Sequence, residues 1–277
     1  MGHEHAHAHV DKWAERHRVR ITRYVKPPGR PVLCRHEHGK TLVKRLPGIL
    51  TVFLLVSSPV QWAWAITAEE RVDHRTQVAL AMDAHPVRGG KYYAQYCASC
   101  HGAIGQGDAG TVVPALAGQR FAYLVRQLAN FAAAQRESPS MHRIATQPAI
   151  DEPQSWVDLA SYLNRLAPRA DNQRGTGEAV PLGRGIFHEQ CASCHGPDAG
   201  GDKEGFVPSL RHQHYGYLNK QMHRLAEGSR HNVDEELVLF MRSFDERDIR
   251  ATADYLSRLQ GAGTVRKTMR QDGVVVN

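Results

Sequence analysis

Aromatic residues are scarce in this chain of 277 residues, and so are patterns of alternating polar and apolar residues. Phe, Trp and Tyr make up 7% of the sequence, against 24 glycines and 14 prolines. No stretch alternates long enough to predict a β-sheet. The length fits two domains of ordinary size, but each would have a thin core of apolar side chains. The sequence therefore predicts two small all-helical domains, each with a core that a bound group helps to fill.

Cysteines are also few, and four of the five lie in two identical pentapeptides. These are Cys97-Ala-Ser-Cys100-His101 and Cys191-Ala-Ser-Cys194-His195, whereas Cys34 stands alone and receives no role. Cys-x-x-Cys-His is the attachment signature of c-type haem. A thioredoxin-like site also has Cys-x-x-Cys, but it needs a neighbouring strand and no adjacent histidine. We therefore predict two covalent haems in place of a disulfide framework.

Thiols and histidines have separate roles in this prediction. His101 and His195 are the proximal iron ligands, because one helical turn carries each of them together with its cysteine pair. Each porphyrin is a large apolar slab that would complete the thin core of its domain. The predicted attachment residues, which bond the haem vinyl groups, are Cys97, Cys100, Cys191 and Cys194.

The net charge of +7 comes from one end of the chain. Residues 1–65 hold 11 Lys and Arg against 4 Asp and Glu, and the remaining residues hold 24 of each class. A basic patch suited to nucleic acid is therefore not expected in the haem domains, and nucleic acid is excluded as a partner.

The basic end also contains a secretory leader. Lys44 and Arg45 precede an apolar run over 46–60, and Trp62-Ala-Trp-Ala65 follows it. This order predicts a signal peptide over 44–65, cleaved after Ala65, and export to the periplasm. The alternative is an uncleaved leader that anchors the protein in the membrane. Residues 1–43 are rich in His and Arg; they are interpreted as an extension without assigned function, or as untranslated sequence.

A repeat with an offset of 94 residues organises the rest of the chain. It pairs Cys97, Pro114, Leu116, Gln119, Tyr123, Gln127 and Arg136 with Cys191, Pro208, Leu210, Gln213, Tyr217, Gln221 and Arg230. Repetition at one displacement indicates a duplicated domain. The expected organisation is an N-terminal segment over 66–86, haem domains over 87–167 and 183–261, a linker over 168–182 and a tail over 262–277.

Each copy is expected to contain three main helices. One leads into the haem motif, and its Gly89 or Gly183 would permit close backbone approach to another helix, with Tyr93 or Phe187 packing one turn on. The others are predicted at 121–134 and 215–227, and at 154–166 and 245–259. Asp245 and Asp248 mark the start of the last helix. The carbonyl groups of Pro114 and Pro208 either accept the proximal histidine N–H or belong to a plain turn.

The sixth iron ligand is predicted separately for each domain. Met141 lies 40 residues after His101, in a loop containing Pro139, and is the expected ligand of the first iron. The repeat offset puts Glu235 opposite Met141, so the second iron needs another group. We choose Met241, just before the final helix, with His231 or an open position as alternatives. Met222 is interpreted as a core residue.

These features resemble the cytochrome c4 family of periplasmic dihaem proteins. The resemblance spans 87–260 and rests on the two Cys-Ala-Ser-Cys-His-Gly segments, on Pro114-Ala-Leu-Ala-Gly-Gln119 and on 245–256. It implies two class I cytochrome c domains with His/Met ligation. It also implies electron transfer from a cytochrome bc1 complex or a dehydrogenase to a terminal oxidase. One departure is that the family's second axial methionine falls at Leu237 here, with Met241 one helical turn later.

The leading hypothesis is an electron carrier without enzymatic activity, since no separate catalytic constellation is evident. An enzyme is the first alternative, such as a peroxidase-like or thiosulfate-oxidising dihaem protein, because that chemistry needs an open or unusually ligated haem. A subunit docked permanently on a larger dehydrogenase or oxidase is the second alternative, and membrane association would then come from the partner or the uncleaved leader.

Overall fold

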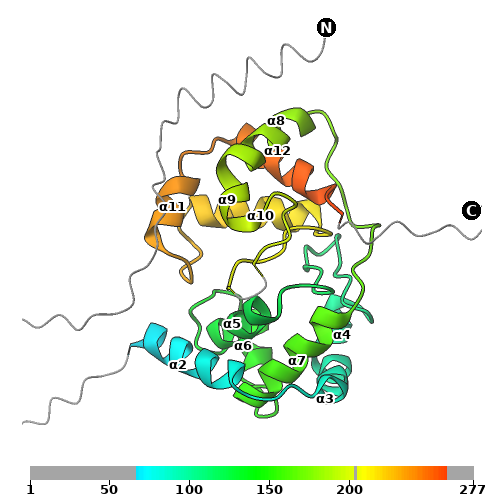
Figure 1. Cartoon of the computed structure of the whole chain (residues 1–277), viewed down its shortest axis with the longest axis vertical. Helices are drawn as coiled ribbons and strands as arrows, with labels where there is room; N and C mark the ends of the chain where they lie inside the picture. Colours follow the sequence, from blue (N-terminus) through cyan, green and yellow to red (C-terminus); the bar gives the residue numbers. More distant parts are fainter. Residues whose placement is uncertain (1–66, 203–204, 261–277) are drawn as a thin grey trace, which may run out of the picture. The chain divides into compact units, whose positions relative to one another are not determined.

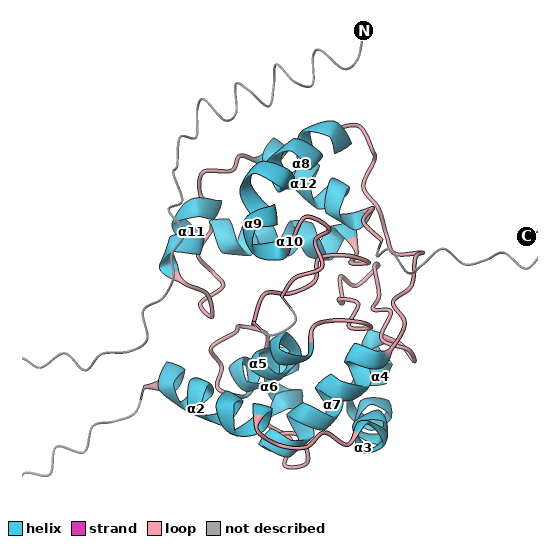
Figure 2. Cartoon of the chain, viewed as in Figure 1, coloured by secondary structure: helices cyan, strands magenta, loops and turns pink. Residues whose placement is uncertain are grey.

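The computed structural model describes residues 67–202 and 205–260 (Figure 1). The predicted extension, signal peptide and tail lie outside the described residues. Helices and connecting loops make up the described residues, where the one β-bridge joins Asp108 to Val113 (Figure 2). The all-helical fold predicted from the sequence is confirmed.

The same order of elements occurs twice along the described chain. The first series is α3 (Pro86–Tyr92), the π-helical turn η1 (Tyr93–Cys97), α4 (Ala98–His101), α5 (Phe121–Ala132), α6 (Pro139–Ala145) and α7 (Pro153–Arg165). The second is α8 (Val180–Ile186), η2 (Phe187–Cys191), α9 (Ala192–His195), α10 (Tyr215–Ala226), α11 (Glu235–Met241) and α12 (Glu246–Ser257). Each series forms one half of the molecule around its own cysteine motif.

Two glycines allow the first and last helices of each half to cross. A Cβ at Gly89 would lie 2.0 Å from the carbonyl oxygen of Asp158 in α7, and one at Gly183 would lie 1.9 Å from that of Ala251 in α12. Real Cβ atoms cannot approach so closely, so only glycine permits this backbone contact. The close approach predicted for these two positions is confirmed.

One turn beyond each glycine, an aromatic side chain closes the core. Tyr93 and Phe187 are 1% and 0% exposed, which shows that both rings are fully covered. The Tyr93 ring lies 5.5 Å from that of Tyr162, and the Phe187 ring lies 5.7 Å from that of Tyr255. Tilted aromatic pairs at such distances add to the stabilisation from burial alone. The haem motif is thus held against the last helix of its half.

An additional helix, α2 (Ala68–Leu80), precedes the first half and was not predicted from the sequence. Thr67 and Glu70 form a capping box at its start. Val72 and Ala79 are buried against the core, and the guanidinium of Arg75 lies 4.3 Å above the Trp156 ring. The mean hydropathy of this helix is low, so its burial depends on a narrow apolar stripe that the sequence reading missed.

One other expectation needs correction. Met141 was expected in a loop, but Ser138 caps the short helix α6 that contains it. Met241, expected just before the final helix, ends the short helix α11 that precedes α12. The linker is predicted to end at 182, and α8 begins at Val180. Short helices of seven residues escape periodicity arguments because two turns carry too few apolar positions.

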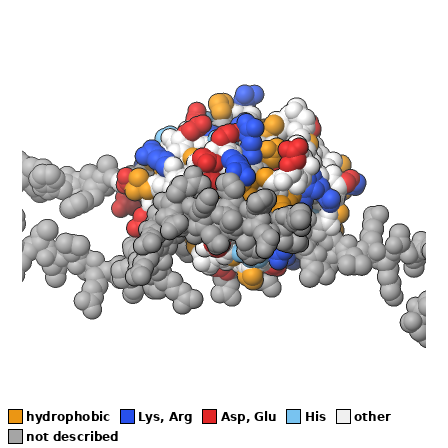
Figure 3. Space-filling model, turned by 90° about the horizontal axis from the view of Figure 1, so that it is seen from above, with side chains coloured by type: hydrophobic (Ala, Val, Ile, Leu, Met, Phe, Trp, Pro, Cys, Tyr) orange, Lys and Arg blue, Asp and Glu red, His pale blue; other side chains and the backbone are white. Residues whose placement is uncertain are grey.

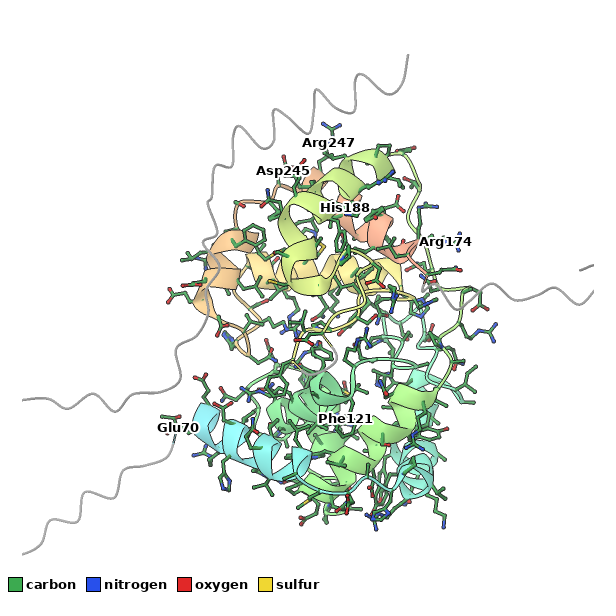
Figure 4. The ribbon with its side chains drawn as sticks, viewed as in Figure 1. Glu70, Phe121, Arg174, His188, Asp245 and Arg247 are labelled. Carbon is green, nitrogen blue, oxygen red and sulfur yellow. The ribbon has the colours of Figure 1, made fainter. Side chains whose placement is uncertain are left out.

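The start of α12 agrees with its prediction. Asp245, labelled in Figure 4, accepts a hydrogen bond from the backbone N–H of Asp248, and the Asp248 side chain bonds back to Asp245. On the face visible in Figure 3, acidic and basic side chains are interspersed, which agrees with the balanced charge of residues 66–277. Among the described residues, no helix is both long and apolar enough to cross a membrane.

Candidate haem-binding sites

Both Cys-x-x-Cys-His motifs adopt the same local structure. A π-helical turn ends at the first cysteine, and a short helix then carries the second cysteine and the histidine. The first cysteines, Cys97 and Cys191, are half-buried, while Cys100 and Cys194 are exposed. All four thiols are free of disulfides. The π-helical turn and the short helix thus meet at the first cysteine of each motif.

The two histidines are oriented by backbone carbonyl groups. His101 Nδ1 donates to the carbonyl oxygen of Pro114 at 3.0 Å, and His195 Nδ1 donates to that of Pro208 at 3.1 Å. Since a carbonyl can only accept, this bond fixes the tautomer and leaves Nε2 as the lone-pair atom for iron. Of the two interpretations of the Pro-containing segments, the orienting role agrees with the structure.

Burial favours the uncharged forms of these groups. It lowers the pKa of both His101 and His195, although each carbonyl bond acts in the opposite direction. Neutral imidazole is the form that binds iron. Burial also raises the pKa of Cys97 and Cys191 to about 12. Both thiols are therefore protonated at neutral pH, which disfavours a thiolate metal site at these positions.

Two arginines concentrate positive charge where the halves meet. Arg136 Nη2 donates to the Tyr217 hydroxyl at 2.8 Å, and Arg230 Nη2 donates to the Tyr123 hydroxyl at 3.4 Å. Burial and then the charge of Arg136 lower the pKa of Arg230. Burial alone would raise the pKa of Tyr123, but both guanidinium groups lower it. Neither arginine has a salt bridge to a carboxylate of the described residues, and uncharged hydrogen-bond partners hold both guanidinium groups.

A second set of paired hydrogen bonds joins the halves. The side-chain amide of Gln119 forms two hydrogen bonds with the backbone of Ser209, at 2.8 and 2.9 Å. The side-chain amide of Gln213 forms two with the backbone of Ala115, at 2.9 and 3.0 Å. Positions 115 and 119 correspond to 209 and 213 in the repeat. Each half therefore binds the other through the same residues, as two subunits do across a twofold axis.

Met141 and Met241 occupy different places in their halves. Met141 is the third residue of α6, half-buried, and its backbone N–H is bonded to Ser138 Oγ at 3.5 Å. Met241 is the last residue of α11, 6% exposed, and packs in a core cluster with side chains of α8 and α12. The two methionines therefore differ in their place on the short helix, and both stay predictions as iron ligands.

Comparison with known proteins gives consistent matches. The family model for cytochrome c matches residues 86–167 and 180–260. A thiosulfate dehydrogenase electron acceptor of Stutzerimonas stutzeri is 28% identical over 72% of this chain and 95% of its own. A cytochrome c4 of Pseudomonas aeruginosa is 30% identical over 65% of this chain and 92% of its own. The structure of reduced cytochrome c4 from Pseudomonas stutzeri has a TM-score of 0.58 at 24% identity, covering 64% of this chain and all of that one.

A duplicated helical fold with one Cys-x-x-Cys-His motif in each half defines a dihaem c-type cytochrome, and the two covalent haems predicted from the sequence are confirmed. Such proteins transfer electrons and work with redox partners. More particularly, the chain belongs to the cytochrome c4 family, as its resemblance predicted.

Proposed function

We propose that this chain is an exported electron carrier of the periplasm, which accepts electrons from a dehydrogenase or a bc1 complex and delivers them to a terminal oxidase or another acceptor. The observation that carries the proposal is the pair of equivalent histidine sites on halves joined by reciprocal hydrogen bonds. Two haems held in one rigid body can pass electrons without movement of the domains. The predicted signal peptide supports the location.

Three residues are proposed as iron ligands within this function. His101 and His195 bind the irons through Nε2, because their Nδ1 atoms are engaged by Pro114 and Pro208. Met141 is the sixth ligand of the first haem, supported by its half-buried place on α6. A thioether opposite histidine raises the reduction potential, which suits delivery to an oxidase.

A dehydrogenase is the donor that the comparisons favour. A relative similar over 95% of its own length is named as the electron acceptor of a thiosulfate dehydrogenase. We propose the same class of donor for this chain. A dihaem enzyme, peroxidase-like or thiosulfate-oxidising, is the second candidate function, and the absence of a methionine at position 237 is the observation that favours it.

Rapid mixing distinguishes these functions. The oxidised holoprotein is mixed with thiosulfate alone, with thiosulfate and a purified thiosulfate dehydrogenase, or with a reduced bc1 complex, and haem reduction is followed optically. A carrier is reduced only when a donor protein is present and turns over no hydrogen peroxide. Reduction by thiosulfate alone, or peroxide turnover, would instead identify an enzyme.

A further inference from the structure

The two short helices α6 and α11 are structural counterparts, and their residues can be paired directly. Each has seven residues and lies between the twelve-residue helix and the last helix of its half. Ser138 is the N-cap of α6 and Asp234 is that of α11. The third residue of each helix is then Met141 in the first half and Leu237 in the second. A leucine side chain has no atom that can bind iron.

Met241 has a different counterpart. It ends α11 as Ala145 ends α6, and the exposed fractions of these side chains are 6% and 0%. Its side chain packs with those of Leu182 and Ile186 from α8 and Ile249 from α12. Met241 therefore fills the core between the short helix and the crossing helices, one turn from the position of Leu237.

The register difference has a visible origin. One residue lies between Arg136 and Ser138, whereas three lie between Arg230 and Asp234. The insertion moves α11 along the chain, so that the repeat offset of 94 no longer applies there. Leu237, and not Glu235, consequently stands at the place of Met141.

The remaining candidate ligands also have counterparts with other roles. Met222 in α10 corresponds to Leu128 in α5 and packs against both core clusters of the second half. His231 corresponds to Glu137; both are exposed, and Glu137 forms a surface salt bridge with Arg224.

The neighbours of His231 hold its segment in place. Arg230 and Asn232 bond to each other, and Asn232 also bonds to Gln127 in the first half. The His231 side chain is exposed, whereas those of Arg230 and Asn232 are partly buried.

We propose that the second haem has no methionine or histidine of the described residues as its sixth ligand, and that its iron binds small exogenous ligands beside Leu237. Carbon monoxide is the matching probe, because it donates a lone pair to ferrous iron and requires no change of oxidation state. The proposal rests on the haem sites of the proposed function and adds a ligand-binding site to one of them.

The test is a titration of the reduced, full-length holoprotein with carbon monoxide, followed by the haem absorption bands. We expect one carbon monoxide to bind per two haems. In the oxidised protein we expect the near-infrared band of Met-ligated haem from one haem alone. Leu237→Met should abolish carbon monoxide binding and double this band. Met241→Leu, which keeps the core volume, should change neither property.

Other outcomes overturn the proposal and identify the true ligand. If the wild-type protein does not bind carbon monoxide but Met241→Leu does, Met241 is the ligand. If His231→Gln is the variant that acquires binding, His231 is the ligand. A protein inert to carbon monoxide that still accepts electrons from its donor contradicts only this inference. Carbon monoxide binding without electron exchange would contradict only the proposed function.

Discussion

Single residues set the chemistry of each haem site. His101 and His195 are equivalent in their bonds to proline carbonyls and in the direction of their pKa shifts, although His101 is buried and His195 is only partly buried. The short helices that follow differ at their third residue, which is Met141 in α6 and Leu237 in α11. Because we propose Met141 as the only methionine ligand, we expect the two haems to have distinct redox properties.

Substitution of Met141 by leucine tests its role as a ligand. The variant keeps the side-chain volume but loses the thioether, so we expect the near-infrared band to disappear and the potential of one haem to fall. A redox titration followed optically measures both. Met222→Leu, placed in the core, is the control and should leave the band intact. Unchanged spectra in both variants would remove Met141 from the ligand set.

At the scale of helices, glycine contacts decide how each haem motif is held. Gly183 brings α8 against α12, and Gly89 brings α3 against α7, at distances that exclude any side chain. The linker contributes further contacts to the second half. Asn172, which is buried, donates to the carbonyl groups of Gln213 and Ser257 at 2.8 and 2.7 Å. The segment between the halves is therefore part of the packed structure.

Substitution of Gly183 by alanine should lower the free energy of unfolding, because the helix crossing leaves no space for a methyl group. Gly183→Ala would put Cβ 1.9 Å from the Ala251 carbonyl oxygen, and the two helices would have to separate. We expect the free energy of unfolding to fall by about 2–3 kcal/mol in denaturant titrations. Gly216→Ala is a matched helical control, because its Cβ meets only the end of the Gln173 side chain at 3.1 Å. Equal effects of the two substitutions would contradict the argument.

The linker contact also predicts a dependence of stability on pH. His212 Nδ1 donates to the Arg169 carbonyl, and burial, opposed by this bond, lowers the pKa of His212 below its ordinary 6.5. A lowered folded-state pKa stabilises the fold above 6.5, and this contribution is lost as the pH falls through the folded value.

Replacement of His212 isolates this effect. We expect His212→Asn to lose less stability than the wild type between about pH 7 and 5, measured by denaturant unfolding at each pH. Asparagine suits the left-handed backbone that His212 adopts, with φ 57°. His74→Asn, at an exposed position of α2, is the control and should keep the wild-type profile. An unchanged profile in His212→Asn would contradict the assignment.

At the scale of the whole molecule, duplication has produced an interface between unlike halves with reciprocal bonds. Gln119 and Gln213 each satisfy a backbone N–H and a backbone carbonyl of the opposite half. Arg136 and Arg230 each reach a tyrosine of the opposite half. These bonds hold the two haem-binding halves together, and we expect electron exchange between the haems to depend on them.

Removal of one interface glutamine should weaken docking of the halves. Gln213→Ala leaves the N–H and carbonyl of Ala115 without their partners, at a cost of about 1 kcal/mol for each of these partly buried groups. We expect a lower unfolding midpoint and slower electron exchange between the haems in pulse experiments. Gln147→Ala, which loses only a bond within its own helical segment, is the control. Wild-type behaviour of Gln213→Ala would show that these bonds do not hold the halves together.

Features that depend on neighbouring residues could be predicted from the sequence. The haem motifs, the repeat, the two glycine positions and the Asp245 cap were predicted because each depends on residues a few positions apart, whose geometry follows from helical spacing. The proximal histidines could be identified for the same reason. Helix α2 and the short helices α6 and α11 were missed, because their patterns are too weak or too short to separate from loops.

Features that depend on distant residues required the folded chain. The repeat alone could not show that Gln119 and Gln213 bond across the halves, since a duplicated sequence is compatible with many arrangements of its copies. Nor could it place Met241, whose separation from His195 suits an iron ligand. Its role in the core is set by the packing of α11 against α8 and α12. The sequence spacing alone leaves both Leu237 and Met241 near the expected ligand position. Only the packing of α11 shows which of the two side chains lies in the core.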